Sequence, residues 1–278
     1  MKEQGRWQDV RRNVCCSSSP STRFIRLAMI SKRQIKYIQG LQQKKHRQQE
    51  GVFVAEGPKV VGDLMEGLDA RMVVATREWM SQHAVPAQTE FIEVSEEELR
   101  RVSFLQHPQQ VLALFPIPDA TCALPSAGTL SLALDGVQDP GNLGTIIRIA
   151  DWFGIETIYC SEDTADAYNP KVVQATMGSI ARVHIVYTDL VSLIEQLPLD
   201  TPVYGTLLDG EDIYKQHLSN HGLVIMGNEG NGISQAVAEK VNRRLFIPPF
   251  PQDRHTADSL NVAIATAIVC AELRKNHQ

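Results

Sequence analysis

The chain has 278 residues, of which 43% are hydrophobic and 21% charged, with a formal net charge of −5 at pH 7. This length suffices for one large or two ordinary globular domains, each with its own core. No apolar run approaches the roughly 18 residues of a membrane-spanning helix, so no membrane contact is expected. Five cysteines (Cys15, Cys16, Cys122, Cys160 and Cys270) contain no CxxC pair. We therefore expect reduced thiols in a cytoplasmic protein, with no disulfide framework and no metal site.

Positive charge is concentrated at the start of the chain. Residues 1–50 hold twelve lysines and arginines against three acidic residues, and the remainder is acidic. A basic front on an acidic body favours a polyanion bound at one end. Within 31–51 the spacing of Ile35, Ile38 and Leu41 predicts a helix with one packed stripe. We interpret its cationic remainder as a nucleic-acid surface, against the alternative of a solvated charged helix; it comprises Lys32, Arg33, Lys36, Lys44, Lys45 and Arg47.

Residues 1–28 are polar, basic and rich in serine, which predicts a disordered tail. Residues 29–117 are predicted to form a first α/β domain. Its expected strands are 52–56, 71–75, 91–94 and 111–115, and its expected helices include 58–65. Ser95, followed three residues later by Glu98, has the pattern of a capping box and predicts a helix start. The prolines and the missing periodicity after residue 116 predict a linker at 118–127.

Residues 128–278 alternate between continuous apolar strands and helices. The expected strands are 129–137, 156–160, 182–186, 202–207, 223–227 and 244–248, and the expected helices are 141–153, 170–178, 189–196, 233–240 and 259–274. This pattern is typical of a parallel α/β sheet with both faces covered. Ligands of such sheets bind beyond the carboxyl ends of the strands, where three segments with unusual polar residues fall.

The first segment, 132–155, ends a strand and begins a helix at Asp139-Pro140-Gly141-Asn142, since proline suits a first helical turn and Asp or Asn a cap. Arg148 lies about 200° around the helix from Ile146 and is expected to face away from the buried stripe. Gly144 is expected to leave the helix surface bare for a ligand. Because a helix N-terminus favours an anion, we interpret Arg148 as a phosphate holder rather than a solvated arginine.

The second segment, 224–234, places Asn228 and Glu229 among three glycines. It matches neither GxGxxG nor a Walker loop. The Glu229 carboxylate is expected either to accept a hydrogen bond from a ligand or to cap the next helix.

The third segment, 258–273, opens at Asp258-Ser259 and continues as an almost wholly apolar helix rich in small residues. Such a helix is expected to be buried on every side, against another subunit as well as the sheet. Asn261, one turn in, is either satisfied in the core or directed at a ligand.

Taken together, DGVQDPGNLGTIIRIA, IMGNEGNGIS and the pair IP followed by SLNVAIATAI resemble the three ordered motifs of the SpoU (TrmH) family of RNA 2′-O-ribose methyltransferases, in the SPOUT superfamily. NPKVVQATMGSI is similar to the family's intervening segment. Residues 31–61 resemble its substrate-binding domain, which is similar to ribosomal protein L30e. The chain departs from the family in PFPQDRHTAD, a long loop without glycine, where Arg254 and His255 either reach RNA or are solvated.

The resemblance implies an α/β trefoil-knot domain at 128–278, preceded by a smaller L30e-like RNA-binding domain, with a homodimer formed through the knot region. It implies S-adenosylmethionine as the cofactor. The residues implied to bind it are Thr206, Leu207, Gly227, Asn228, Gly230, Ile247, Pro248 and Leu260. The implied catalytic residues are Asn142, Arg148, Glu229, Ser259 and Asn261.

The implied reaction is attack of a ribose 2′-hydroxyl on the sulfonium methyl group, so the enzyme supplies alignment and deprotonation. Proposals for the family make the first-motif arginine the general base. A guanidinium is effectively always protonated in proteins, so we expect Arg148 to bind the adjacent phosphate and stabilise the alkoxide. Glu229 or a water would accept the proton, and Ser259 and Asn261 would position the ribose.

The L30e-like front favours ribosomal RNA as substrate, with transfer RNA as the alternative. A non-catalytic RNA-binding or ribosome-assembly protein of the same fold is disfavoured, because Asn142, Arg148, Glu229 and Asn261 are all present. An unrelated nucleotide-binding oxidoreductase is disfavoured because no predicted strand is followed by GxGxxG.

Overall fold

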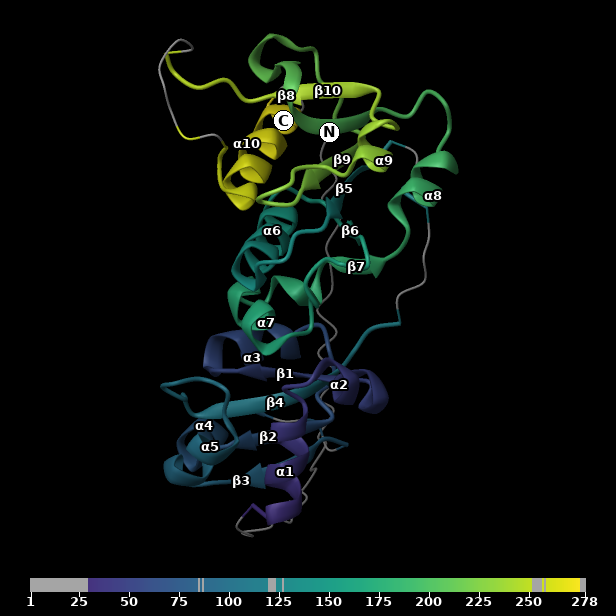
Figure 1. Ribbon diagram of the computed structural model, residues 1–278. Coiled ribbons are helices and arrows are strands. Elements are labelled where there is room, and N and C mark those ends of the chain that lie inside the picture. The colour runs from purple at the N-terminus through teal and green to yellow at the C-terminus, as the bar shows by residue number, and fades with distance from the viewer. Residues whose placement is uncertain are drawn as a thin grey trace, which may run out of the picture.

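The computed structural model describes residues 30–84, 86, 88–119, 124–126, 128–251, 257 and 259–275. The expected tail at 1–28, residues 120–123 and 127 of the expected linker, and Arg254 and His255 lie outside these residues. Figure 1 shows two sheets, one above the other, each flanked by helices. No helix in the described ranges is long and apolar enough to cross a membrane.

The first sheet has four strands in the order β1-β4-β2-β3, and only the β2–β3 pair is parallel. One face packs against α1 and α5 and the other against α3 and α4. The elements are α1 Lys32–Gly40, α2 Lys44–Glu50, β1 Val52–Glu56, α3 Pro58–Met65, β2 Met72–Ala75, α4 Arg77–Gln82, β3 Glu90–Glu93, α5 Glu96–Val102 and β4 Val111–Pro116. The predicted capping box is confirmed, because Ser95 Oγ accepts from the Glu98 N–H and Glu98 Oε2 from the Ser95 N–H.

The single helix expected within 31–51 is wrong, since the chain forms two helices separated by a turn. Ile35, Ile38 and Leu41 are buried as expected, but Leu41 already lies at the C-cap of α1. Arg47 of α2 turns back and donates to the Leu41 and Gln42 carbonyls at 2.7 and 2.8 Å. In a continuing helix these carbonyls would accept from backbone N–H groups. Here they accept from the Arg47 side chain, so the helix ends there.

The second sheet has six strands, all parallel, in the order β10-β8-β9-β5-β6-β7, which confirms the expected α/β class. Every residue of β5 and β9 is buried, because helices cover both faces. The elements are β5 Leu130–Asp135, α6 Pro140–Trp152, β6 Thr157–Cys160, α7 Pro170–Thr176, η1 Ser179–Ala181, β7 His184–Tyr187, α8 Leu190–Glu195, β8 Val203–Asp212, η2 Ile213–Lys215, β9 Gly222–Gly227, α9 Gln235–Ala238, β10 Arg243–Phe246 and α10 Val262–Arg274.

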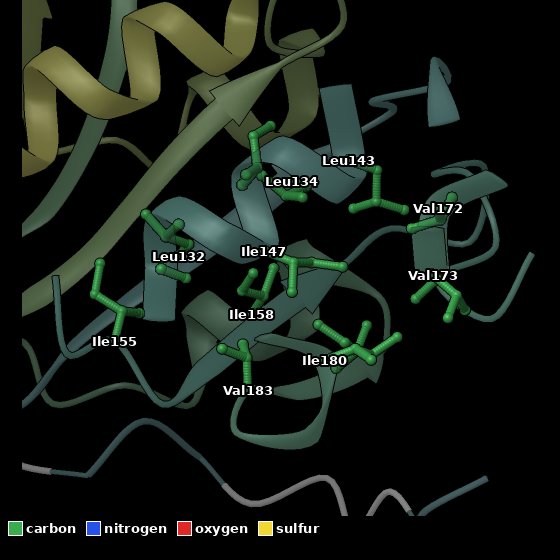
Figure 2. Packing of buried hydrophobic residues seen from close by; sticks show 14 of the residues in the cluster. Leu132, Leu134, Leu143, Ile147, Ile155, Ile158, Val172, Val173, Ile180 and Val183 are labelled. Carbon is green, nitrogen blue, oxygen red and sulfur yellow. The ribbon is translucent and has the colours of Figure 1, made fainter. Parts of the chain in front are cut away.

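One face of this sheet carries α6, α7 and α10, and the opposite face carries α8 and α9. Figure 2 shows leucine, isoleucine and valine side chains of β5, β6, α6 and α7 gathered into one cluster. After the edge strand β10 the chain returns to the middle of the sheet, where α10 packs against α6, β9 and η2. The knot itself stays a prediction, because part of the segment between β10 and α10 lies outside the described residues.

Gly144 on α6 does not have the role predicted for it. It is buried, and a Cβ there would lie 2.4 Å from Ala175 Cβ and 2.8 Å from the Val172 carbonyl oxygen. The missing side chain therefore allows α6 to pack closely on α7, and no ligand reaches its backbone.

The two sheets are joined by a packed interface. Arg47 of α2 forms an ion pair with Asp166 in the loop after β6, and both side chains are largely buried. Phe53 of β1 packs on Tyr168 with ring centroids 5.2 Å apart. A single hydrophobic cluster runs through both halves, so the first sheet is held in a defined position against the second.

Candidate active site

The three motif segments meet at the carboxyl ends of β5 and β9 and the first turns of α6 and α10. Asp139 Oδ1 accepts from the Asn142 N–H at 2.8 Å and caps α6, as predicted. Asn261 caps α10, with Oδ1 accepting from the Ala263 and Ile264 N–H groups. Asn261 was expected one turn inside a helix beginning at 259. The helix begins at Val262 because this side-chain cap fixes its start.

Two hydrogen bonds connect one side chain from each motif. Asn142 Nδ2 donates to Glu229 Oε1 at 2.8 Å, and Asn261 Nδ2 donates to Asn142 Oδ1 at 2.9 Å. Asn261 is therefore both a helix cap and a member of this polar row, which fixes the direction of the Asn142 amide. Glu229 is exposed, so its carboxylate is held in place yet open to solvent. The arrangement places an oriented carboxylate beside two helix N-termini.

The turn that carries Glu229 is closed by its own backbone. The Asn228 and Gly232 backbones exchange hydrogen bonds at 2.9 Å in both directions. Asn228 Oδ1 accepts from the Gly230 N–H, and its Nδ2 donates to the Gly136 carbonyl at 2.7 Å. A Cβ at Gly227 would lie 2.3 Å from the Gly232 carbonyl carbon, so only glycine fits there. Asn228 and Gly230 thus shape the turn.

Arg148 and Ser259 stand apart from this row. Arg148 is exposed on α6, as predicted, and within the described ranges its guanidinium forms no hydrogen bond or ion pair. Ser259 is exposed and precedes the α10 cap by two residues. The structure therefore brings Asn142, Glu229 and Asn261 together. Arg148 and Ser259 are exposed to solvent and hold no hydrogen bond to this row within the described residues.

The residues implied to hold the cofactor lie within β8, at and just after the end of β9, and beyond β10. The β8–β10 register jumps from Gly205–Arg244 to Glu211–Leu245, so residues 206–210 are skipped in this pairing. Thr206 Oγ1 lies 3.5 Å from the Ile225 carbonyl oxygen, which ties this segment to β9. Beyond β10, Ile247 and Pro248 are half-buried, and Leu260 is 50% exposed. Skipped backbone groups beside partly covered apolar side chains fit a nucleoside-like cofactor with polar edges.

Five of the six cations predicted to contact nucleic acid are exposed. Lys32, Arg33 and Lys36 lie on α1, and Lys44 and Lys45 on α2, with Lys44 Nζ 5.5 Å from the Tyr187 ring centroid. The sixth prediction, Arg47, is corrected. Arg47 is 1% exposed, and its guanidinium is occupied by two carbonyls and Asp166, so no phosphate reaches it.

Two anchors of the site were missed from the sequence. Asp135 Oδ2 accepts from the Ser234 N–H at 2.7 Å and fixes the end of the second motif. Ser161 Oγ accepts from the Gly136 N–H at 2.8 Å and fixes the turn after β5. A buried aspartate ending an otherwise apolar strand was the available signal for Asp135. A cavity of about 500 Å³ lies elsewhere, at the amino ends of β5, β6 and β7, and contains none of these residues.

Both halves of the chain match known protein families. Residues 129–271 match the SpoU rRNA methylase family, and residues 32–113 match the MRM3-like substrate binding domain. The chain belongs to the SpoU rRNA methylase family. This SpoU chain is 32% identical to a Bacillus subtilis 23S rRNA (guanosine(2553)-2′-O)-methyltransferase, RlmP, over 84% of its own length and 93% of the relative's.

Two solved structures resemble this SpoU protein over most of its length. A putative RNA methyltransferase of the TrmH family from Porphyromonas gingivalis is 40% identical, with a TM-score of 0.81, covering 90% of this chain and all of that one. An AdoMet-bound rRNA methyltransferase from Sinorhizobium meliloti is 32% identical, with a TM-score of 0.78, covering 88% and 95%. The smaller first sheet and the parallel second sheet are thus the architecture of SpoU proteins.

Proposed function

We propose that this protein transfers the methyl group of S-adenosylmethionine to a ribose 2′-hydroxyl of ribosomal RNA. The observation that carries the proposal is the polar row Glu229–Asn142–Asn261, which aligns one side chain from each motif where parallel sheets bind ligands. The AdoMet-bound state of the Sinorhizobium relative and the activity of RlmP support the same reaction class.

When bound, S-adenosylmethionine supplies a methyl group already activated by the positive sulfur. Backbone groups of Thr206, Leu207, Gly227 and Gly230 would hold it, with Ile247, Pro248 and Leu260 covering its apolar parts. Asn228 keeps the 227–232 turn in shape. The remaining task of the protein is to orient the ribose hydroxyl and remove its proton.

The division of labour among the polar residues follows from their contacts. Glu229 is the proton acceptor, directly or through a water, because the Asn142 amide holds its carboxylate at one oxygen. Arg148 is free of protein partners within the described ranges and always charged, which suits it to the phosphate next to the target ribose and to the developing alkoxide. Ser259 and Asn261 position the ribose from the start of α10.

The five exposed cations on α1 and α2 support a polyanion as substrate, and the ribosomal RNA named for RlmP favours that RNA over transfer RNA. We place the RNA-binding domain at 29–117, the linker at 118–127 and the methyltransferase domain at 128–278.

We further propose a homodimer in the cytoplasm. The dimer would form through the C-terminal knot region, where Trp152 of α6 is 85% and Ile264 of α10 is 53% exposed. Large apolar side chains exposed on adjacent helices are typical of a subunit interface.

The test is incubation with methyl-labelled S-adenosylmethionine and separate unmethylated ribosomal and transfer RNA. We expect label in ribosomal RNA only. The phosphodiester bond next to the labelled ribose should resist alkaline hydrolysis, because the 2′-hydroxyl is methylated. Label in neither RNA would favour the non-catalytic alternative, and label in transfer RNA alone would transfer the proposal to that substrate.

A further inference from the structure

We propose that a cavity between α3, α5 and the loop 103–110 is a pocket for one unpaired base of the RNA substrate. The cavity measures about 270 Å³ and lies in the first half of the protein, away from the methyl-transfer site. This inference rests on the proposed function only in taking RNA as the ligand.

The walls of the cavity have the mixed character of a base-binding site. Pro58, Leu99 and Pro108 supply apolar surface, and Arg100, Gln109 and Gln110 supply polar groups. Within the described ranges none of these three polar side chains forms a hydrogen bond or ion pair with the protein. Ligand sites for drug-sized molecules begin at about 300 Å³, so the volume suits a single base better than a longer segment.

The loop that forms one wall is held at its start by a buried carboxylate. Glu56 is 5% exposed at the end of β1, where its Oε1 accepts from the Phe104 N–H at 2.8 Å and its Oε2 from the Ser103 hydroxyl. A charge is kept out of water only when such donors compensate it. Glu56 therefore serves to fix the loop.

The end of the loop is fixed by backbone hydrogen bonds. The Gln110 carbonyl accepts from the Thr76 N–H at 2.8 Å, and the Val111 carbonyl accepts from the Gly57 N–H at 2.9 Å. With both ends tied, the cavity exists before RNA arrives, and binding costs little ordering of the loop.

Gln110 has a backbone conformation that favours glycine. Its φ is +46°, in the left-handed region that a glutamine adopts only at a cost. Such strain persists where the surrounding structure imposes it and is concentrated at functional sites. Glycine would adopt this φ without strain, yet the residue is Gln110. We infer that its side-chain amide, which lines the cavity, contacts the bound base.

The groups present match the way proteins read RNA. Sequence-specific recognition of RNA targets unpaired bases, which stack on aromatic or guanidinium planes and form hydrogen bonds along their edges. Arg100 offers such a plane, and the amides of Gln109 and Gln110 both donate and accept. Glu96 also lines the cavity, and its carboxylate repels a phosphate, so a base fits here better than the RNA backbone.

The cavity and the methyl-transfer site lie in two halves of the protein that pack against each other. Figure 1 shows α10, α6, α7 and α3 one below another. Contacts of α10 with α6, of α6 with α7 and η1, and of η1 with α3 connect the second half of the protein to α3, whose Pro58 lines the cavity. An RNA that contacts both halves of the protein would place one nucleotide at Glu229 and another at the cavity.

The test compares two matched pairs of variants in the full-length protein. Arg100→Ala is paired with Arg101→Ala, which removes the same charge from the next residue of α5 outside the cavity. Gln109→Ala is paired with Gln106→Ala, an exposed glutamine in the same loop that does not line the cavity. The readouts are the Kd for an unmethylated large-subunit ribosomal RNA transcript, the Kd for S-adenosylmethionine, and KM and kcat for methyl transfer.

We expect Arg100→Ala and Gln109→Ala to raise the Kd and KM for RNA about tenfold, which is at the low end of the effect of losing one stacked base. The kcat and the affinity for S-adenosylmethionine should not change. Each control variant should change the Kd less than threefold. If Arg100→Ala and Gln109→Ala weakened RNA binding no more than their control variants, the proposed pocket would be refuted. Because RNA affinity is measured without catalysis, a wild-type protein that transfers no methyl group would refute the proposed function and still leave this comparison decisive.

A second readout locates the base directly. A photoreactive phenylalanine analogue at position 109 should crosslink to one unpaired nucleotide of the transcript, and the same analogue at position 106 should not. Crosslinks from position 109 confined to paired RNA, or spread over many nucleotides, would contradict the pocket.

Discussion

Asn142 Nδ2 donates to Glu229 Oε1 at 2.8 Å, and this bond joins two motifs 87 residues apart in the sequence. Asn261 in turn fixes Asn142 through a 2.9 Å bond to its Oδ1. A carboxylate has two acceptor oxygens, so the bond to Oε1 leaves Oε2 for a ribose hydroxyl. Orientation of Glu229 by Asn142 is thus the feature on which the proposed chemistry depends.

The first prediction concerns that bond. Asn142→Asp has nearly the same shape but replaces the donor with a carboxylate that repels Glu229. We expect kcat to fall about 100-fold, the scale of a misplaced proton acceptor, with S-adenosylmethionine affinity unchanged. Single-turnover methyl transfer and cofactor titration measure the two quantities. Asn220→Asp, the same change outside the site, should behave as wild type; equal losses in both variants would refute the role of Asn142.

The second prediction separates the roles of Glu229 and Arg148. Glu229→Gln removes the proton acceptor, so the residual rate should be low and nearly independent of pH. Arg148→Lys keeps the charge but loses the planar fork that binds phosphate, so kcat/KM should fall about tenfold or more while the pH–rate profile keeps its shape. A Glu229→Gln profile parallel to wild type would show that another group takes the proton.

A third prediction follows from the buried Arg47–Asp166 ion pair. Arg47→Met leaves Asp166 and two carbonyls without their partner, so the free energy of unfolding should fall by about 3 kcal/mol in chemical denaturation. Lys45→Met, on the same helix but exposed, should leave stability unchanged and weaken RNA binding. If Arg47→Met weakened RNA binding and left stability unchanged, Arg47 would belong to the RNA-binding surface after all.

The fourth prediction uses Glu56. Burial raises the pKa of its carboxyl above the ordinary value of 4.5, against the opposing hydrogen bonds from Ser103 and Phe104. The folded protein therefore binds this proton more tightly than the unfolded chain, and stability rises as pH falls through the folded pKa toward 4.5. The stability of wild type relative to Glu56→Gln should accordingly be greater at pH 5 than at pH 8. A difference independent of pH, or of opposite sign, would contradict this.

Elements with strong local signals were predictable from the sequence. The continuous apolar strands predicted the parallel sheet, and α3 begins and ends as expected at Pro58 and Met65. Ser95 with Glu98 predicted its helix start because a capping box is a local pair of contacts. The predictions for Arg47 and Gly144 were wrong because of contacts between residues far apart in the sequence. Arg47 is buried in an ion pair with Asp166, 119 residues away, and Gly144 lets α6 pack closely on α7.

The candidate site divides in the same way. Asn142, Glu229 and Asn261 were identified as polar residues that a core does not need, and their residue types were sufficient for that. Their mutual bonds join residues 87 and 119 positions apart and depend on how α6, β9 and α10 pack. An aspartate at the end of an apolar strand was the sequence signal for Asp135, but only the fold shows that its side chain accepts from the Ser234 N–H.

The most direct measurement is the position of the transferred methyl group. Unmethylated large-subunit ribosomal RNA is incubated with the protein and S-adenosylmethionine, and the modified nucleotide is identified by nuclease digestion and mass spectrometry. We predict one 2′-O-methylated ribose, formed by wild type and reduced about 100-fold by Asn142→Asp. A methyl group on a base, or 2′-O-methylation that Asn142→Asp leaves intact, would contradict the proposed site.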